Sequence, residues 1–275
     1  MRVTISQIKA MKQKGEKISM LTAYDYTTAK IVDEAGLPLI LVGDSLGMVV
    51  LGYDSTLPVT LEVMIHHIKA VMRGAKNALV VGDMPFMTYQ ASVEDAMHNA
   101  GRFMQEAGCQ AVKLEGGVTV AATVKKMTDA GIPVMGHIGL TPQSINQLGG
   151  HKIQGKTAEA AKRLLDDAIA LDQAGAFGVV LETVPAPLAA LISRKISIPT
   201  IGIGAGAGCD GQVQVIHDIL GSFTDYVPKH TKRYATIADI TAKAVAQYHA
   251  EVKSGAFPTE AQSFPLDASV LAGLE

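Results

Sequence analysis

The chain has 275 residues, of which 48% are hydrophobic and 18% charged, so it can fill a sizeable apolar core. Its 24 Lys and Arg nearly balance 26 Asp and Glu, and a net charge of −2 argues against nucleic acid as the main partner. No apolar run approaches the roughly 18 residues of a membrane helix. Two distant cysteines and an N-terminus without an apolar leader favour a cytoplasmic protein with reduced thiols.

Short apolar runs alternate with helical periodicities along the chain. The runs are apolar on both faces, as in a parallel sheet covered by helices. Between them, residues 61–72 have helical spacing, with Thr60 as a candidate N-cap. Eight such runs predict an α/β fold, a single-domain (βα)8 TIM barrel over residues 1–264, with residues 265–275 as a C-terminal tail. The predicted strands are residues 18–24, 39–43, 78–82, 111–115, 134–138, 178–182, 198–203 and 225–228.

A polar side chain stands at the end of several predicted strands. These residues are Asp44, Asp83, Glu115, His137 and Glu182. The carboxyl ends of all barrel strands open on one face, so these side chains should converge there. Carboxylates gathered in a small volume repel one another, and a bound Mg²⁺ commonly offsets this repulsion. A single acid of this kind could instead only cap the following helix.

Three of the candidates have open alternatives. Lys113 lies two residues before Glu115 and points to the same side of its strand, where it could grip a substrate carboxylate or form a structural ion pair with Glu115 or Asp83. Glu182 could be a general base or a helix cap. His137 could contact substrate, support a partner or sit as a satisfied core histidine.

Two segments break the regular pattern. Residues 141–156 are polar, Gly-rich and too long for an ordinary connection, which predicts a lid. Residues 202–208 are Gly-rich but lack the order of a dinucleotide fingerprint. This second segment either lets a ligand approach the backbone or only relieves crowding.

Long motifs then identify a family. The chain resembles the ketopantoate hydroxymethyltransferase (3-methyl-2-oxobutanoate hydroxymethyltransferase) family over about residues 4–264. The motifs are L-T-A-Y-D-Y (21–26), V-G-D-S-L-G-M (42–48), D-S-T-L-P-V-T (54–60), K-L-E-G-G (113–117), G-H-I-G-L-T-P-Q-S (136–144) and I-G-I-G-A-G (201–206).

The resemblance implies a (βα)8 barrel that transfers a hydroxymethyl group from 5,10-methylenetetrahydrofolate to 3-methyl-2-oxobutanoate. The product would be 2-dehydropantoate, for pantothenate and coenzyme A biosynthesis. It also implies a Mg²⁺-stabilised enolate and a homo-oligomer, commonly a decamer.

The resemblance also implies residue roles. Asp44 and Asp83 would ligate Mg²⁺, with Glu115 completing the metal shell. The oxoacid would contact Ser45 and Lys113 as well as the two aspartates. Glu182 would be the catalytic base.

Two other readings stay open. A Mg²⁺-dependent C–C lyase or phosphonomutase barrel would share the strand-end acids, but such a lyase should carry a lid cysteine in a K-[KR]-C-G-H-like block, and residues 141–156 contain no Cys. A non-catalytic oxoacid binder could use the same fold. The intact set of candidate acids argues against such a loss of activity.

Overall fold

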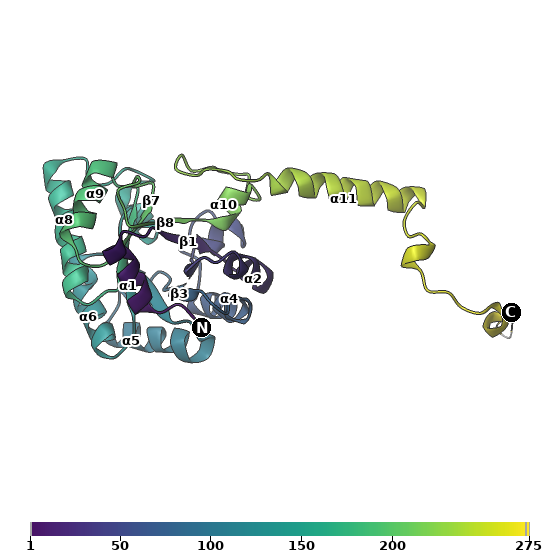
Figure 1. The fold of residues 1–275 in the computed structure, drawn as a ribbon, viewed down its shortest axis with the longest axis horizontal. Helices are drawn as coiled ribbons and strands as arrows, with labels where there is room; N and C mark the ends of the chain where they lie inside the picture. Colours follow the sequence, from purple (N-terminus) through teal and green to yellow (C-terminus); the bar gives the residue numbers. More distant parts are fainter. Residues whose placement is uncertain (1, 273, 275) are drawn as a thin grey trace.

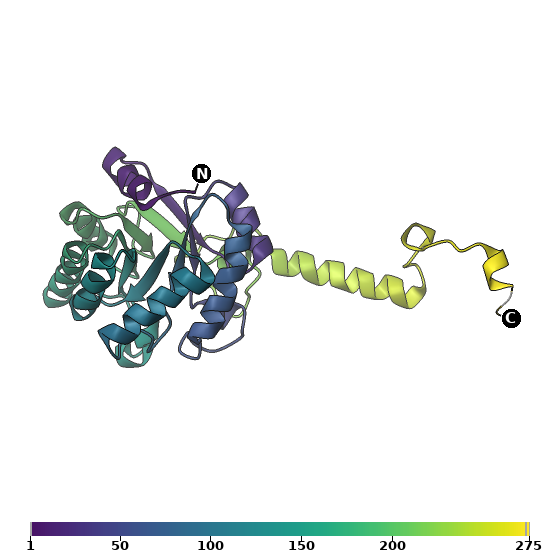
Figure 2. The same cartoon turned by 90° about the horizontal axis from the view of Figure 1, so that it is seen from below.

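The chain folds into a closed barrel of eight parallel strands, as the sequence predicts (Figures 1 and 2). The computed structural model describes residues 2–272 and 274. Each strand pairs with its neighbours in chain order, and β8 pairs with β1 to close the ring. The strands are β1 Ile18–Thr22, β2 Leu39–Val42, β3 Leu79–Asp83, β4 Ala111–Glu115, β5 Val134–Gly139, β6 Gly178–Glu182, β7 Thr200–Ile203 and β8 Gly211–Gln214.

Alternation along the strands separates two apolar cores. Leu39 and Leu41 of β2 belong to the cluster inside the barrel, whereas Ile40 and Val42 join the larger cluster between strands and helices. Because successive side chains of a strand point to opposite faces, one short apolar run fills both cores. This explains why the strand runs show no polar face.

Helices cover the barrel, and four of the main ones begin at side-chain caps. Thr60 accepts a hydrogen bond from the backbone N–H of Val63, as its predicted capping role requires. The main covering helices are α2 Tyr26–Glu34, α4 Leu61–Gly74, α5 Val93–Arg102, α6 Ala121–Asp129, α8 Ala158–Gln173 and α9 Ala186–Lys195, with a π-helical turn Phe103–Ala107 after α5. Shorter helices are α3 Leu46–Val49, α7 Ile145–Leu148, α10 Ile216–Leu220 and α12 Ala268–Leu271, and 3₁₀ turns span Val118–Val120, Pro142–Ser144 and Glu260–Gln262.

The predicted eighth strand is wrong. Residues 225–228 lie in an irregular segment, and β8 is Gly211–Gln214 instead. The G-Q-V-Q sequence of β8 alternates buried and more exposed residues, so it lacks the continuous apolar run that marks the other strands. Its Gly211 is needed because a Cβ there would lie 2.3 Å from the carbonyl oxygen of Ile18 on β1.

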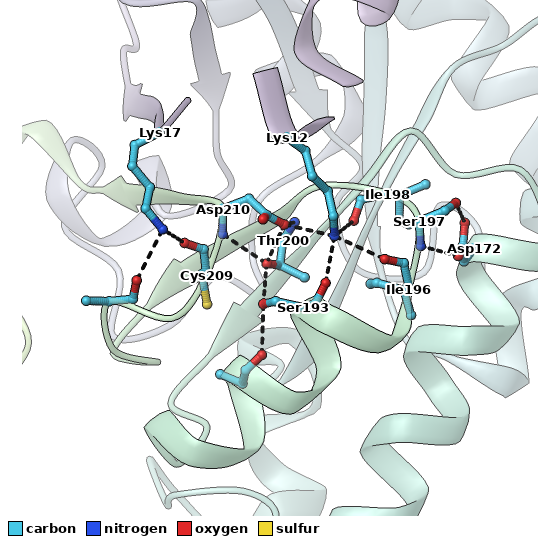
Figure 3. A network of polar contacts seen from close by, with 12 residues as sticks. Lys12, Lys17, Asp172, Ser193, Ile196, Ser197, Ile198, Thr200, Cys209 and Asp210 are labelled. Carbon is cyan, nitrogen blue, oxygen red and sulfur yellow. Dashed lines mark hydrogen bonds and ion pairs between the residues drawn. The ribbon is translucent and has the colours of Figure 1, made fainter. Parts of the chain in front are cut away.

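Helix α1 (Ile5–Lys14) packs on the inner core of the barrel, and Figure 3 shows the polar contacts of its Lys12. Ile8 is fully buried in the inner core. The Lys12 ammonium donates to the carbonyls of Ser193, Ile196 and Ile198 at 2.8–3.1 Å and pairs with Asp210 at 3.0 Å. One lysine thus ties α1 to the end of α9, the segment leading into β7 and the start of β8.

The long helix α11 (Ile237–Ser254) leaves the barrel and projects from it, and the segment after it continues outward (Figures 1 and 2). No residue of α11 is buried. The division at residue 264 into barrel and tail stays a prediction. Both cysteines are buried free thiols, and none of the helices in the described part of the chain is long and apolar enough to cross a membrane.

Candidate active site

The predicted strand-end residues converge at the carboxyl end of the barrel. They line one cavity of about 590 Å³. Asp44 follows β2 after Gly43, where a Cβ would lie 2.8 Å from Ser45 Oγ, so the glycine permits the tight passage from strand to site. The cavity side chains Asp44, Ser45, Asp83, Lys113, Glu115, His137 and Glu182 all come from β2 to β6 or the residues directly after them.

Lys113 and Asp83 form a buried ion pair. The Lys113 ammonium lies 2.7 Å from Asp83 Oδ1, and both side chains are at most 5% exposed. Burial lowers the pKa of Lys113. The surrounding carboxylates raise this pKa by a larger amount, so it lies above its ordinary value. Lys113 therefore pairs with Asp83, and its contact with a substrate carboxylate stays a prediction.

Asp44 lies beside this pair. Its backbone N–H donates to Asp83 Oδ2 at 3.2 Å, and its own carboxylate accepts from the side chain of Gln143 at 2.9 Å. Burial and then the negative charge of Asp83 raise the pKa of Asp44 well above its ordinary value. Two carboxylates this close favour a cation between or beside them.

His137 lies between two carboxylates. Its Nδ1 is 3.4 Å from Glu115 Oε1 and its Nε2 is 3.2 Å from Glu182 Oε2, although neither contact has hydrogen-bond geometry. Burial lowers the pKa of His137, but the two carboxylates outweigh it and raise the pKa to about 9. This shift favours the protonated ring, and of the three predicted roles of His137 this geometry favours support of a partner carboxylate.

Ser45 points toward a tyrosine of the preceding strand-end loop. Its Oγ lies 2.8 Å from the hydroxyl of buried Tyr24. Burial raises the pKa of Tyr24 above 10, so this phenol stays protonated and can donate to Ser45. The Ser45 hydroxyl proton is then free to point into the cavity.

The oxygen atoms present suit a hard cation. Glu115 Oε1 is buried without a hydrogen-bond partner, and burial and the charge of Asp83 raise the pKa of the Asp44 carboxyl although Lys113 lowers it in part. No group of three His, Cys, Asp or Glu in the described chain forms a closed metal-binding cluster. Mg²⁺ does not require one, because it is commonly held by one or two carboxylates plus water and substrate oxygens.

Two loops form the mouth of the cavity. Pro142, His151 and Ile153 come from the predicted lid, residues 141–156, and Tyr226 and His230 come from the segment after β8. The first loop is partly ordered into the turn at Pro142–Ser144 and α7. Its closure over substrate stays a prediction.

The Gly-rich segment 202–208 is explained by crowding. A Cβ on Gly206 would lie 2.5 Å from that of Ala186, and one on Gly208 would lie 2.6 Å from that of Ala190. Gly204 also lines the cavity, with a Cβ position 3.1 Å from His230 Nδ1. Close packing against α9 therefore accounts for two of these glycines.

Sequence reasoning missed three residues of the site. Gln143 and Tyr89 are buried among the acids, and Tyr24 supports Ser45. Tyr24 and Gln143 stand inside the motifs that identify the family, but their types gave no chemical signal. Only the fold shows that Tyr89, six residues after Asp83, turns back toward the cavity.

Comparison with known proteins identifies the family. The profile described as ketopantoate hydroxymethyltransferase matches residues 2–260. A 3-methyl-2-oxobutanoate hydroxymethyltransferase of Dehalococcoides mccartyi is 66% identical over 275 residues, covering 100% of this chain and 99% of the relative. One from Carboxydothermus hydrogenoformans is 60% identical over 270 residues, covering 98% of each chain.

Solved structures of low sequence identity share the fold. Phosphoenolpyruvate phosphomutase from Streptomyces platensis subsp. rosaceus superposes with a TM-score of 0.61 at 17% identity, covering 98% of this chain and 94% of that one. A phosphonopyruvate hydrolase in complex with oxalate and Mg²⁺ gives 0.61 at 11% identity, covering 99% and 94%. These likenesses show the barrel alone. The family match over nearly the whole length shows that the chain belongs to the ketopantoate hydroxymethyltransferase family, a family of transferase enzymes.

Proposed function

We propose that this enzyme transfers a hydroxymethyl group from 5,10-methylenetetrahydrofolate to 3-methyl-2-oxobutanoate, giving 2-dehydropantoate for pantothenate biosynthesis. One observation supports the proposal: a single cavity is lined by Glu182, whose carboxylate lies 3.2 Å from His137, and by the buried carboxylates of Asp44, Asp83 and Glu115. A 2-oxo acid requires a base at C3 and positive charge at its oxygens, and the site offers places for both.

Glu182 is the proposed base. Glu182 lines the cavity, and His137 Nε2 lies 3.2 Å from its carboxylate. Glu182 takes the C3 proton, which leaves the electron pair as an enolate. Water hydrolyses the opened folate iminium, which breaks its carbon–nitrogen bond and releases formaldehyde and tetrahydrofolate. The enolate carbon then forms a bond to the formaldehyde carbon, and the resulting alkoxide takes back the proton from Glu182 to give the hydroxymethyl product.

The other acids are proposed to hold substrate and metal. Asp44 and Asp83 would ligate Mg²⁺, with Glu115 completing its shell directly or through water. When bound, Mg²⁺ supplies a Lewis acid that polarises the 2-oxo group of the substrate. Lys113 and the Ser45 hydroxyl would contact the oxoacid at the cavity floor, as would the two aspartates.

The first test separates the two halves of the reaction. Deuterium uptake at C3 of 3-methyl-2-oxobutanoate is measured in D₂O without folate, with Mg²⁺ or with a chelator, for wild type and Glu182→Gln. We expect exchange that requires both Mg²⁺ and Glu182, with Glu182→Gln slowing it by about 10²-fold or more. Glu159→Gln, at an exposed position of α8, is the matched control and should exchange at the wild-type rate.

The outcomes are distinct. If exchange persists in Glu182→Gln, the base lies elsewhere. If wild type shows neither exchange nor turnover after methylenetetrahydrofolate is added, the transferase proposal is wrong, and tight oxoacid binding in that case would indicate a binder. Exchange that survives the chelator would remove Mg²⁺ from the proposal.

We also propose that the enzyme is a cytoplasmic homo-oligomer, a decamer by the family resemblance. In support, α11 has 18 residues and buries none of them. Most helical stability in proteins comes from the packing of an apolar face, so we expect α11 to have a packing partner. Its exposed apolar side chains follow helical spacing and suit another copy of the chain; they are Ile237, Ile240, Val245, Tyr248 and Val252.

A further inference from the structure

Two buried side chains outside the predicted site connect its acids. Tyr89 is 2% exposed and Gln143 is 4% exposed. Tyr89 lies after β3, and Gln143 lies in the 3₁₀ turn Pro142–Ser144 that begins the 141–156 loop. Neither side chain lines the cavity. Any effect of these two residues on a bound ligand must therefore pass through the acids that line the cavity.

The Gln143 amide has one chemically sensible orientation. Its Nε2 donates to Asp44 Oδ2 and to the carbonyl of Met84, each at 2.9 Å. Both partners are acceptors only, so reversing the amide would place an oxygen against two oxygens. Its Oε1 accepts from the Tyr89 hydroxyl at 2.7 Å and from Gln90 at 3.2 Å.

Tyr89 and the Gln143 backbone extend this network to Glu115. The backbone N–H of Glu115 donates to the Tyr89 hydroxyl at 3.0 Å, which leaves the hydroxyl proton for Gln143. The backbone N–H of Gln143 donates to Glu115 Oε2 at 3.0 Å. That contact leaves Glu115 Oε1 as the carboxylate oxygen without a hydrogen bond.

We infer that Gln143 and Tyr89 are positioning residues that fix the Asp44 and Glu115 carboxylates for the divalent cation of the proposed function, on which this inference rests. Gln143 occupies one oxygen of each carboxylate, through its side chain and its backbone. The second oxygen of each accepts no hydrogen bond from the described residues and would face the cation, with His137 Nδ1 3.4 Å from that of Glu115. Because Gln143 belongs to the 141–156 loop, displacement of that loop would also disturb these carboxylates.

The test measures Mg²⁺ affinity by calorimetry beside folate-free C3 exchange. Gln143→Met keeps the length of the side chain and removes its donors. It should weaken Mg²⁺ binding by roughly 10–100-fold, as is typical for residues that hold metal ligands. Tyr89→Phe removes a single oxygen and should weaken it by about 10-fold, the lower end of that range. The matched control is Gln154→Met, in the same loop. The Gln154 side chain donates to the Lys152 carbonyl, and this variant should bind Mg²⁺ like wild type.

Two further readouts distinguish positioning from a general loss of structure. The exchange rates of both variants should recover toward wild type as Mg²⁺ is raised, which a general loss of structure would not produce. The double variant should weaken Mg²⁺ binding by less than the sum of the two single effects, because Tyr89 and Gln143 share a hydrogen bond. If wild type binds Mg²⁺ and both variants match it, the inference is wrong while the proposed function stands. If wild type binds no Mg²⁺, the metal part of the proposed function fails and this inference fails with it.

Discussion

The buried pair of Lys113 and Asp83 determines the charge balance of the cavity floor. Both side chains are at most 5% exposed, and Asp83 also accepts from the backbone of Asp44. A charge in such a place is tolerated only because its partner is there. Residue-level changes in this group should therefore affect stability as well as activity.

Removing one partner of this pair should be more harmful than removing both. Lys113→Met leaves the Asp83 carboxylate buried and uncompensated, so we expect the free energy of unfolding to fall by about 3–5 kcal/mol. Lys113→Met combined with Asp83→Leu removes both charges and should recover most of that loss. Denaturant unfolding without divalent cation measures both values. Equal destabilisation by the single and the double variant would contradict the argument.

Asp218 gives a pH-dependent prediction. Burial raises the pKa of this α10 carboxyl from 3.8 to about 6, an effect that Arg233 only partly offsets. The folded state then holds a proton that the unfolded state has lost between pH 4 and pH 6, so this residue makes stability fall as pH rises through that window. Asp218→Asn should raise the melting temperature at pH 7 and leave it unchanged below pH 4.

The comparison for Asp218 is Asp225→Asn. Asp225 is exposed in the segment that follows, so its charge stays in water in both states. This variant should leave the pH dependence of unfolding as in wild type. The assigned role is wrong if the melting temperature of the wild type changes between pH 4 and pH 7 by no more than the melting temperature of Asp218→Asn does.

At the scale of elements, seven strands were predictable and one was not. Strands β1 to β7 are short apolar runs because helices and an inner core bury both their faces. Strand β8 alternates glutamine with small and apolar residues. The segment 225–228, whose Tyr226 and Val227 suggested a strand, belongs to a loop. Local hydrophobicity therefore indicated the wrong segment, and only barrel closure identifies the right one.

The candidate site also contains residues that the sequence predicts and residues that it does not. The strand-end acids were predictable because a barrel brings all carboxyl ends to one face. Tyr89 and Gln143 lie on connections, whose path depends on tertiary packing. Their hydrogen bonds join segments 54 residues apart, which no local pattern indicates.

Helix α1 should depend on a single lysine for its attachment. Lys12 donates to three carbonyls and pairs with Asp210, and both side chains of that pair are at most 21% exposed (Figure 3). Lys12→Met removes these charge-assisted bonds, so unfolding should become easier by about 2 kcal/mol. Amide hydrogen exchange of residues 5–14 should also rise. Lys14→Met, on the exposed side of the same helix, should change neither quantity.

At the scale of the whole molecule, the projecting helix predicts self-association. Val245 is 60% exposed and Tyr248 is 58% exposed on α11, an apolar surface that a solitary chain would leave in water. Sedimentation velocity of the wild type should show a homo-oligomer, and Val245→Lys with Tyr248→Lys should shift it toward smaller species. The matched control, Lys243→Glu with Gln247→Lys, changes polar positions of the same helix and should leave the oligomer intact. Because the proposed catalytic and metal-binding side chains all come from β2 to β6 or the residues directly after them, the dissociated variant should still exchange C3 of the oxoacid. A wild-type chain that sediments as a monomer at all concentrations would show that α11 stands free in solution.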